Sequence, residues 1–332
     1  MSAIDGATAS RELVLDELRS ADKLLLATHE RPDGDALGSL VGMQLALEYL
    51  GKDVLSYVAP EEFPLPGEYT WLELSGLVTE PPADISERTV VFLDCGNSDR
   101  IRAMSLREDG ARLLNVDHHH DNTRFGTVDH VVPDASCTAE IVWDLMQGLG
   151  VPLDRRIGEA LYVGLVTDTG RFMYENTTAR SHVMAADVIR AGVDVHEIYR
   201  RLYEGVPTGK LQLLARGLDN LQRYDRGVLT LSQLSRRDFA EAHADESFSE
   251  GVVDHLRALD GTAVAGLIRE LDSGQPNLVR KVSLRATDDR VDVSIIARAM
   301  GGGGHRRAAG FSTELPFPDL VEFLRREVGA QL

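Results

Sequence analysis

Two short segments of the chain concentrate carboxylate and imidazole side chains within a few residues. The first is His29-Glu30-Arg31-Pro32-Asp33-Gly34-Asp35, and the second is Asp117-His118-His119-His120. Each follows a short apolar run that is typical of a buried strand. Carboxylate oxygen and imidazole nitrogen together suit borderline divalent metals such as manganese better than calcium. The two segments therefore indicate a divalent-metal site.

A third segment, Gly301-Gly302-Gly303-Gly304-His305, combines glycines with a histidine. Because glycine has no side chain, its backbone N–H group can approach phosphate oxygens closely. The ring N–H of a histidine can donate to the same anion. A flexible linker is the alternative interpretation, but Arg306-Arg307 follows directly and the chain then returns to Ala308-Ala309-Gly310, which is unusual for a linker. Together the three segments indicate a metal-dependent hydrolase that acts on a phosphate ester.

The elements that must position these residues can be read from hydrophobic patterning. Apolar runs at 23–27, 90–93 and 113–116 are too short for helices and predict buried strands. Helical spacing of apolar residues follows at 37–45, 142–149 and 157–165, and Gly51 is placed to end the first of these helices. Strands that alternate with helices imply a largely parallel α/β sheet. Ligands bind at the carboxyl ends of such strands, where His29, Asp94 and His118 are found.

The second half of the chain has a different pattern. Residues 194–222 have a helical, polar pattern, and each of the segments 227–231, 263–271, 278–284 and 291–296 fits a strand or a short helix. The last amphipathic helix is expected at 320–328. We therefore predict an α/β catalytic domain at 1–193 with a mainly parallel sheet flanked by helices, a helical connector at 194–224 and a smaller α+β domain at 225–332.

Composition narrows the class of protein. The chain has 332 residues, 43% of them hydrophobic, which suffices for a substantial core and two domains. No run approaches the ~18–20 apolar residues of a membrane span, and the start lacks the features of a signal peptide. Cys95 and Cys137 have no CxxC spacing, so neither a disulfide framework nor a zinc site is indicated. We expect a cytoplasmic protein without a membrane partner.

Charge is distributed unevenly. The net charge of −18 argues against a broad surface for long duplex DNA. Residues 261–332 hold 10 basic and 9 acidic residues, so 25 basic and 44 acidic residues remain for the rest of the chain. A small anionic substrate held by a local basic patch fits this distribution better than a long nucleic acid.

Hydrolysis of a phosphodiester at neutral pH needs a strong nucleophile and compensation for developing negative charge, and two metals close together supply both. The candidate ligands are two histidines and four aspartates: His29, Asp33, Asp35, Asp94, His118 and Asp168. The four negative charges of these carboxylates would balance the four positive charges of two divalent cations.

Each candidate also has an ordinary structural interpretation. Asp33 and Asp35 could belong to a turn and a capped helix, Asp94 to a turn, and Asp168 to a helix end. The histidines after Asp117 could lie in an exposed loop. Taken together, these separate explanations are disfavoured, because every candidate falls at the expected end of a strand or helix.

Six motifs, in order along nearly the whole chain, resemble the DHH/DHHA1 phosphoesterase family, which is named for the Asp-His-His triplet found here as Asp117-His118-His119. The six lie at residues 28–39, 92–94, 117–119, 167–170, 282–285 and 301–310. Within the family, the likeness is greatest to short bacterial members that are bifunctional oligoribonucleases (nano-RNases) and 3′-phosphoadenosine 5′-phosphate (pAp) phosphatases. Arg171-Phe172-Met173-Tyr174 departs from the usual pattern after the fourth motif, which leaves the role of Arg171 open.

The resemblance implies two Mn²⁺ ions per chain, with Mg²⁺ or Co²⁺ as alternatives. One ion would be held by His29, Asp33 and Asp94, and the other by Asp35, His118, Asp168 and the bridging Asp94. Asp117 would orient a ligand imidazole, His119 would contact the scissile phosphate or assist the leaving oxygen, and His120 would be peripheral. Arg285, Gly302, Gly303, Gly304 and His305 would bind substrate in the second domain.

The expected substrates are short RNA, dinucleotides and pAp. The resemblance to the family also suggests a homodimer. A cyclic di-AMP or pApA phosphodiesterase would use the same chemistry and stays open as an alternative. A manganese pyrophosphatase would lack the glycine-rich segment. A non-catalytic nucleotide-binding regulatory protein is the alternative of a different class, and it would not need a complete set of ligands.

Overall fold

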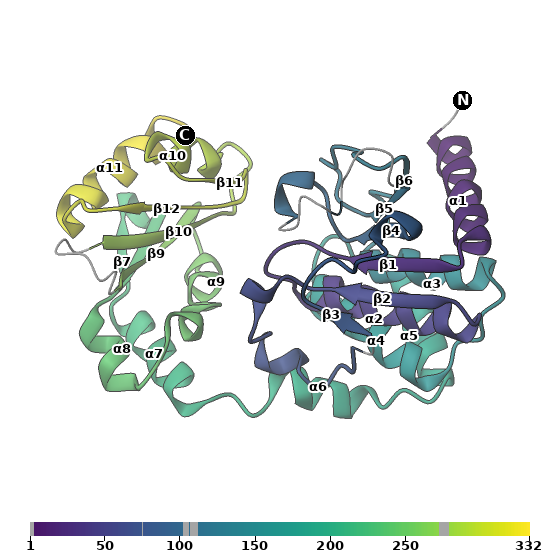
Figure 1. The fold of residues 1–332 in the computed structure, drawn as a ribbon. Helices are drawn as coiled ribbons and strands as arrows, with labels where there is room; N and C mark the ends of the chain where they lie inside the picture. The colour runs from purple at the N-terminus through teal and green to yellow at the C-terminus, as the bar shows by residue number, and fades with distance from the viewer. Residues whose placement is uncertain (1–2, 75, 102–105, 107–111, 272–278) are drawn as a thin grey trace. The chain divides into compact units, whose positions relative to one another are not determined.

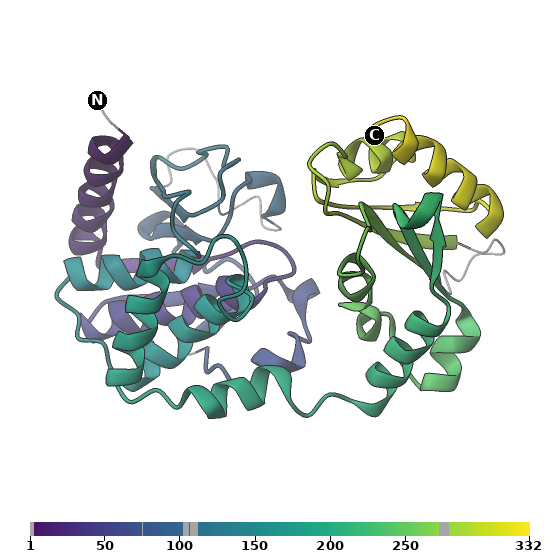
Figure 2. The ribbon, with the colours of Figure 1, turned by 180° about the vertical axis from the view of Figure 1, so that it is seen from behind.

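The structure is a computed structural model that describes residues 3–74, 76–101, 106, 112–271 and 279–332. The chain forms two compact units, Met1–Glu204 and Gly205–Leu332 (Figure 1 and, from behind, Figure 2). The expected connector at 194–224 contains two helices, of which α6 (Val195–Tyr203) belongs to the first unit and α7 (Thr208–Asp219) to the second. Within the described ranges, we find no helix with the length and apolar character needed to cross a membrane.

Six parallel strands form the sheet of the first unit, in the order β3-β2-β1-β4-β5-β6. The strands are β1 (Lys23–Ala27), β2 (Asp53–Tyr57), β3 (Leu77–Val78), β4 (Thr89–Leu93), β5 (Leu113–Asp117) and β6 (Val128–Val131). The three predicted strands are confirmed as β1, β4 and β5, whereas β2, β3 and β6 were not predicted. The strand order reverses between β1 and β4, and such a reversal creates a crevice at the carboxyl ends of the strands.

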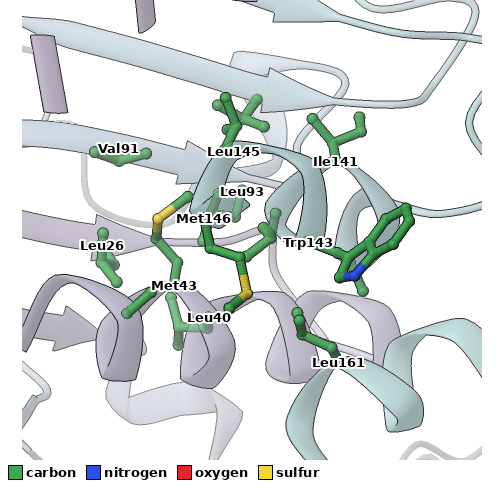
Figure 3. Close-up of a cluster of buried hydrophobic side chains, with 14 of the residues drawn as sticks. Leu26, Leu40, Met43, Val91, Leu93, Ile141, Trp143, Leu145, Met146 and Leu161 are labelled. Carbon is green, nitrogen blue, oxygen red and sulfur yellow. The ribbon is translucent and has the colours of Figure 1, made fainter. Parts of the chain in front are cut away.

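Helices cover one face of this sheet (Figure 1). They are α1 (Ala3–Ser20), α2 (Gly34–Tyr49), α3 (Thr138–Gly148), α4 (Arg155–Asp168) and α5 (Ala179–Arg190). Because side chains alternate along a strand, Leu24 and Leu26 of β1 join the core under the helices, whereas Leu25 and Ala27 join a second core on the other face. Figure 3 shows the first core, where Leu26 and Val91 of the sheet lie near Met43 of α2 and Met146 of α3.

Helices α2 and α4 pack against each other through glycines. A Cβ atom added at Gly38 would lie 2.4 Å from the Ala160 carbonyl oxygen, and one added at Gly164 would lie 2.7 Å from a carboxylate oxygen of Asp35. The two backbones can approach this closely only because these positions carry no side chain. The approach brings the first turn of α2 beside the last turn of α4.

The second unit contains a mixed sheet in the order β11-β12-β10-β9-β8-β7, in which only the β8–β9 pair among the described pairs is parallel. Its strands are β7 (Gln222–Tyr224), β8 (Leu229–Leu234), β9 (Val264–Leu271), β10 (Val279–Ala286), β11 (Gly303–His305) and β12 (Ala308–Thr313). Its further helices are α8 (Arg236–Ala242), α9 (Val252–Arg257), α10 (Val293–Ala299) and α11 (Phe317–Gly329). Two hydrophobic cores lie in this unit, one under α10 and α11 and one under α7 and α9. The predicted fold class, α/β followed by a smaller α+β domain, is confirmed.

The glycine-rich segment is ordered secondary structure rather than a linker. Gly301 has a φ of 74° and follows the end of α10, and the Gly302 N–H donates to the Ala297 carbonyl at 2.9 Å. Residues from Gly303 onward form the edge strand β11, which pairs with β12. A Cβ atom added at Gly303 would meet open space, so the backbone is accessible there.

Candidate metal centre

The central residues of the candidate site follow the ends of three neighbouring strands of the first sheet. Asp94 follows β4 directly, between His29 after β1 and His118 after β5. Nε2 of His29 lies 3.5 Å from Asp94 Oδ2, and Nε2 of His118 lies 3.6 Å from Asp94 Oδ1. Asp94 therefore stands between two imidazoles, with one carboxylate oxygen toward each.

Two helix termini add further carboxylates. Asp35, in the first turn of α2, places Oδ2 3.9 Å from His118 Nε2, and Asp168, the last residue of α4, places Oδ2 3.7 Å from the same nitrogen. Asp33 groups with His29 and Asp94, with one potential ligand atom from each lying within 4.8 Å of the others. All six candidate ligands therefore lie in this region: His29, Asp33 and Asp94 form one group, Asp35, His118 and Asp168 form a second, and Asp94 also groups with His118 and His119.

Some of these aspartates also have the ordinary roles that the sequence allowed. Asp33 is the N-cap of α2, and its Oδ1 accepts the N–H groups of Asp35 and Ala36 at 3.1 Å. Asp168 ends α4. The structural role and a role as a ligand do not compete, because each carboxylate has lone pairs left over after accepting these hydrogen bonds.

The crowding of carboxylates changes their protonation. Burial, reinforced by the charges of Asp94, Asp168 and Asp33, raises the pKa of Asp35 above its ordinary value. Burial also raises the pKa of Asp168 to about 6, although His118 opposes this. Burial would raise the pKa of Asp94 too, but His29 and the other imidazoles outweigh it and hold this pKa below its usual range.

His29 is oriented to present one ring nitrogen to Asp94. Nδ1 lies 2.7 Å from the Glu30 carbonyl oxygen and 2.9 Å from Nη2 of Arg100, and only the carbonyl can accept a ring proton. With its proton on Nδ1, the ring keeps a lone pair at Nε2. Burial lowers the pKa of His29, but the hydrogen bond and charge of Asp94 outweigh it, so this pKa is raised.

Asp117 orients the imidazole of His119. It is fully buried, and its Oδ1 lies 2.8 Å from Nδ1 of His119 while its Oδ2 accepts from Asn122 at 2.6 Å. Burial lowers the pKa of His119, but Asp117 outweighs it and raises this pKa to about 9. His120 is exposed. Arg171 has its guanidinium 5.1 Å from the centre of the Tyr203 ring.

Sequence reasoning missed three residues at the centre. Thr138, the first residue of α3, donates from Oγ1 to Asp94 Oδ1 at 3.0 Å, and Asn176 donates to Asp168 Oδ2 at 3.1 Å. Arg100 places its guanidinium beside His29. Only Thr138 had a local signal, because Ser136-Cys137-Thr138-Ala139-Glu140 is typical of a helix start. The other two are recognised only through contacts across the fold.

The candidate substrate-binding residues lie in the second unit. Arg285 of β10 pairs in register with Ala308 of β12, which in turn pairs with His305 of β11. The Arg285 side chain is 30% exposed, and its nearest carboxylate oxygen, from Asp254, lies 3.8 Å from Nε. The guanidinium is therefore only weakly paired. The side chain of His305 lies outside the described residues.

The donor set fits divalent metal ions. Imidazole nitrogens and carboxylate oxygens are suitable ligands for manganese and related cations. Burial and the charges of neighbouring aspartates raise the pKa values of Asp35 and Asp168, and a bound cation would offset both causes. The buried Thr28 hydroxyl, which precedes His29, has no hydrogen-bond partner.

Solved structures and characterised relatives resemble the whole chain. The bifunctional oligoribonuclease and PAP phosphatase NrnA of Thermus thermophilus is 33% identical over 301 residues, which span 90% of this chain and 86% of that protein. An exopolyphosphatase-related protein from Bacteroides fragilis has the same fold, with a TM-score of 0.86 and 24% identity, covering 97% of this chain and 96% of that one. RecJ from Thermus thermophilus in complex with Mn²⁺ matches with a TM-score of 0.58 and 15% identity, covering 98% of this chain and 55% of RecJ.

Family models assign both units. The model of the DHH family, N-terminal domain, matches residues 23–165, and the model of the DHHA1 domain matches residues 231–330. The first match includes the ends of β1, β4 and β5, and the second includes Arg285 and the glycine-rich segment. The chain belongs to the DHH family, with a DHH domain followed by a DHHA1 domain.

Proposed function

We propose that this phosphoester hydrolase of the DHH family cleaves short oligoribonucleotides to mononucleotides and removes a phosphate from pAp, using two Mn²⁺ ions. The observation that carries the proposal is the convergence of Asp35, Asp94 and Asp168 on one nitrogen of His118. The 33% identity to a bifunctional oligoribonuclease and PAP phosphatase supports the choice of substrates.

In this proposal, one ion is held by His29, Asp33 and Asp94. The other is held by Asp35, His118, Asp168 and again Asp94, which would be shared. When bound, the ions would supply Lewis acidity that lowers the pKa of water and neutralises charge on the phosphate. The group of His29, Asp33 and Asp94 and the group of Asp35, His118 and Asp168 support this assignment, and Asp94 Oδ1 lies 3.6 Å from His118 Nε2.

Two further side chains of the first unit would act on the substrate itself. His119 has its Nδ1 occupied by Asp117, so it would present Nε2 to a phosphate or leaving oxygen. Arg100 would add a positive charge to the site. Both roles fit the transfer of a phosphoryl group, whose negative charge must be stabilised as the bond breaks.

The second unit would bind the rest of the nucleotide. Arg285 is partly exposed and weakly paired, which suits a guanidinium that receives an anion. Gly303 and Gly304 would offer backbone, and open space at Gly303 supports this role. Gly302 would not offer its N–H, because that group already donates to the Ala297 carbonyl. His305 would contribute from the same strand.

A substrate panel tests the proposal. The purified chain is incubated with pAp, pApA, a labelled RNA ladder of 2 to about 20 nucleotides, short DNA and cyclic di-AMP, with Mn²⁺ or with EDTA. We expect Mn²⁺-dependent release of mononucleotide from the shortest RNAs and of phosphate from pAp. Faster turnover of the longest RNA, or hydrolysis of cyclic di-AMP alone, would overturn the substrate assignment.

Variants separate catalysis from folding. Asp35→Asn and His118→Ala should abolish turnover while circular dichroism stays that of the wild type. Nucleotide binding without turnover by the wild type in Mn²⁺ would instead indicate a regulatory binding protein. The expected homodimer is tested by light scattering on the same sample.

A further inference from the structure

The segment that begins α3 contacts the carboxylates that surround His118. The Thr138 backbone N–H donates to Asp35 Oδ2 at 2.6 Å, and the Ala139 N–H donates to Asp35 Oδ1 at 2.9 Å. Both donors belong to the first turn of α3, where backbone N–H groups have no partner within the helix. The fully buried Asp35 carboxylate therefore has each oxygen held by the N-terminus of a helix from another part of the chain.

The side chain of Thr138 reaches a second carboxylate. Its Oγ1 donates to Asp94 Oδ1 at 3.0 Å, and this is the oxygen that faces His118. Thr138 is itself completely buried. One residue thus ties together Asp35 from α2 and Asp94 from β4, which are 59 positions apart in the sequence.

Asn176 holds the third carboxylate. Its Nδ2 lies 3.1 Å from Asp168 Oδ2, 3.1 Å from the Asp168 carbonyl oxygen and 2.8 Å from the Ser136 carbonyl oxygen. Because all three partners are acceptors, the orientation of this amide is determined. Through Ser136 it links Asp168 to the same segment that holds Asp35 and Asp94.

These hydrogen bonds should matter for metal binding because the carboxylates repel one another. Without donors, Asp35, Asp94 and Asp168 would rotate apart, and a metal would have to reassemble them. Each donor occupies one lone pair and leaves others free on the oxygens that lie 3.6–3.9 Å from His118 Nε2. Asp33 differs, since it is exposed and its described side-chain hydrogen bonds come from the first turn of its own helix.

We propose that Thr138 and Asn176 are positioning residues that preorganise the metal position around His118. Loss of a group that orients a metal ligand typically lowers metal affinity about 10- to 100-fold. Asn176 contacts Asp168, which belongs to the His118 position alone, whereas Thr138 contacts Asp94, which both proposed positions share. Loss of Asn176 should therefore weaken one position, and loss of the Thr138 hydroxyl should weaken both. The inference rests on the proposed function only in assuming that a divalent metal binds here.

Mn²⁺ titration of the full chain, followed by calorimetry and by the electron paramagnetic resonance signal of free Mn²⁺, tests this without substrate. Thr138→Val removes the hydroxyl and keeps the shape, whereas Thr138→Ser keeps the hydroxyl. We expect Thr138→Val to weaken Mn²⁺ binding about 10- to 100-fold and Thr138→Ser to restore it. Asn176→Leu, which removes the donor without adding a charge, should weaken one of the two binding steps.

Thr127→Val is the matched control, since its hydroxyl bonds only to backbone groups of Leu113, outside the site. Circular dichroism of the metal-free variants checks folding, and Asn176→Leu provides a second test if Thr138→Val does not fold. Wild-type Mn²⁺ affinity in folded Thr138→Val and Asn176→Leu would overturn the inference. If the variants bind Mn²⁺ more weakly but the wild type hydrolyses none of the substrates, the positioning role is supported and the proposed function is wrong. If the wild type binds no Mn²⁺, both the positioning role and the proposed function are wrong.

Discussion

Gly38 of α2 lies directly against the backbone of Ala160 in α4, so that a methyl group at Gly38 would come within 2.4 Å of the Ala160 carbonyl oxygen. The neighbour is backbone and cannot rotate away. The spacing of α2 and α4 is thereby determined at the point where these helices carry Asp35 and Asp168 toward His118. The packing of α2 against α4 therefore also sets the geometry of the candidate metal centre.

Gly38→Ala should consequently damage stability and metal binding together. Forcing the helices apart should cost roughly 1–3 kcal/mol of unfolding free energy and should weaken Mn²⁺ binding, because Asp35 and Asp168 would separate. Urea unfolding without metal and Mn²⁺ titration measure the two effects. Gly67→Ala, where the added methyl meets open space, is the control and should be close to neutral. A stable Gly38→Ala protein with unchanged affinity would contradict this coupling.

Asp94 should determine whether any metal binds, because it is the ligand shared by the two proposed positions and groups both with His29 and Asp33 and with His118 and His119. Mn²⁺ at 100 times its dissociation constant should stabilise the wild type by about 2.7 kcal/mol, and EDTA should reverse this. Asp94→Asn should remove the stabilisation while the metal-free protein stays folded, since its side-chain oxygen can still accept from Thr138. Thermal melting with Mn²⁺ and with EDTA provides the measurement. A Mn²⁺-dependent increase in melting temperature in Asp94→Asn would show that the metal binds elsewhere.

Arg100 should act on substrate rather than on metal. Its guanidinium lies beside His29 and has no described carboxylate partner, so it is available to a phosphate. Arg100→Ala should lower kcat/KM for pAp about 100-fold, the usual effect of losing one donor to a developing oxyanion, and should leave Mn²⁺ affinity intact or increased. Steady-state kinetics with parallel Mn²⁺ titration separate these effects. Arg156→Ala, on the exposed start of α4, is the control.

His130 should make the protein acid-sensitive. Burial lowers the pKa of His130 to about 4 from its ordinary 6.5, and the ring is neutral with Nδ1 2.9 Å from the Ser10 hydroxyl. The unfolded chain binds a proton at this residue below pH 6.5 and the folded chain does not. The stabilisation is therefore fully present above pH 6.5 and is lost as the pH falls toward 4.

The loss attributable to His130 should reach at most about 3 kcal/mol at pH 4. His130→Gln should flatten the dependence of unfolding free energy on pH between 6.5 and 4, as measured by urea unfolding of the metal-free protein. His196→Gln, at an exposed position of α6, is the control substitution. An identical pH dependence in wild type and His130→Gln would assign the sensitivity to other groups.

Much of the fold could be predicted from local patterns. The apolar runs of β1, β4 and β5 are buried on both faces, so they stand out in the sequence as continuous hydrophobic stretches. β2 and β6 were missed because polar residues interrupt them, as in Asp53–Tyr57. Residues 291–296 fitted either class of element, and packing of Val293 and Ile296 in the second unit's core resolves them as part of α10.

The candidate ligands could be found from sequence because each follows a recognisable strand or helix end, and parallel strands place their carboxyl ends along one edge. Strand order, which sets β1, β4 and β5 side by side, is not encoded in any local pattern. Thr138 and Arg100 were missed for the same reason, because their partners Asp94 and His29 lie 44 and 71 positions away along the chain. Asn176 lies only 8 positions from Asp168, but no local pattern indicates the turn that brings them within 3.1 Å.

The sequence by itself therefore determined the kinds of side chain, the elements that carry them and the family to which they belong. Tertiary structure alone decided which oxygen faces which nitrogen, which backbone donors hold Asp35, and that the glycine-rich segment is an edge strand. Residue type and hydrophobic periodicity determine the structure of only a few neighbouring positions. Distances between atoms of different elements depend instead on how whole strands and helices pack, as the contact of Gly38 with Ala160 illustrates.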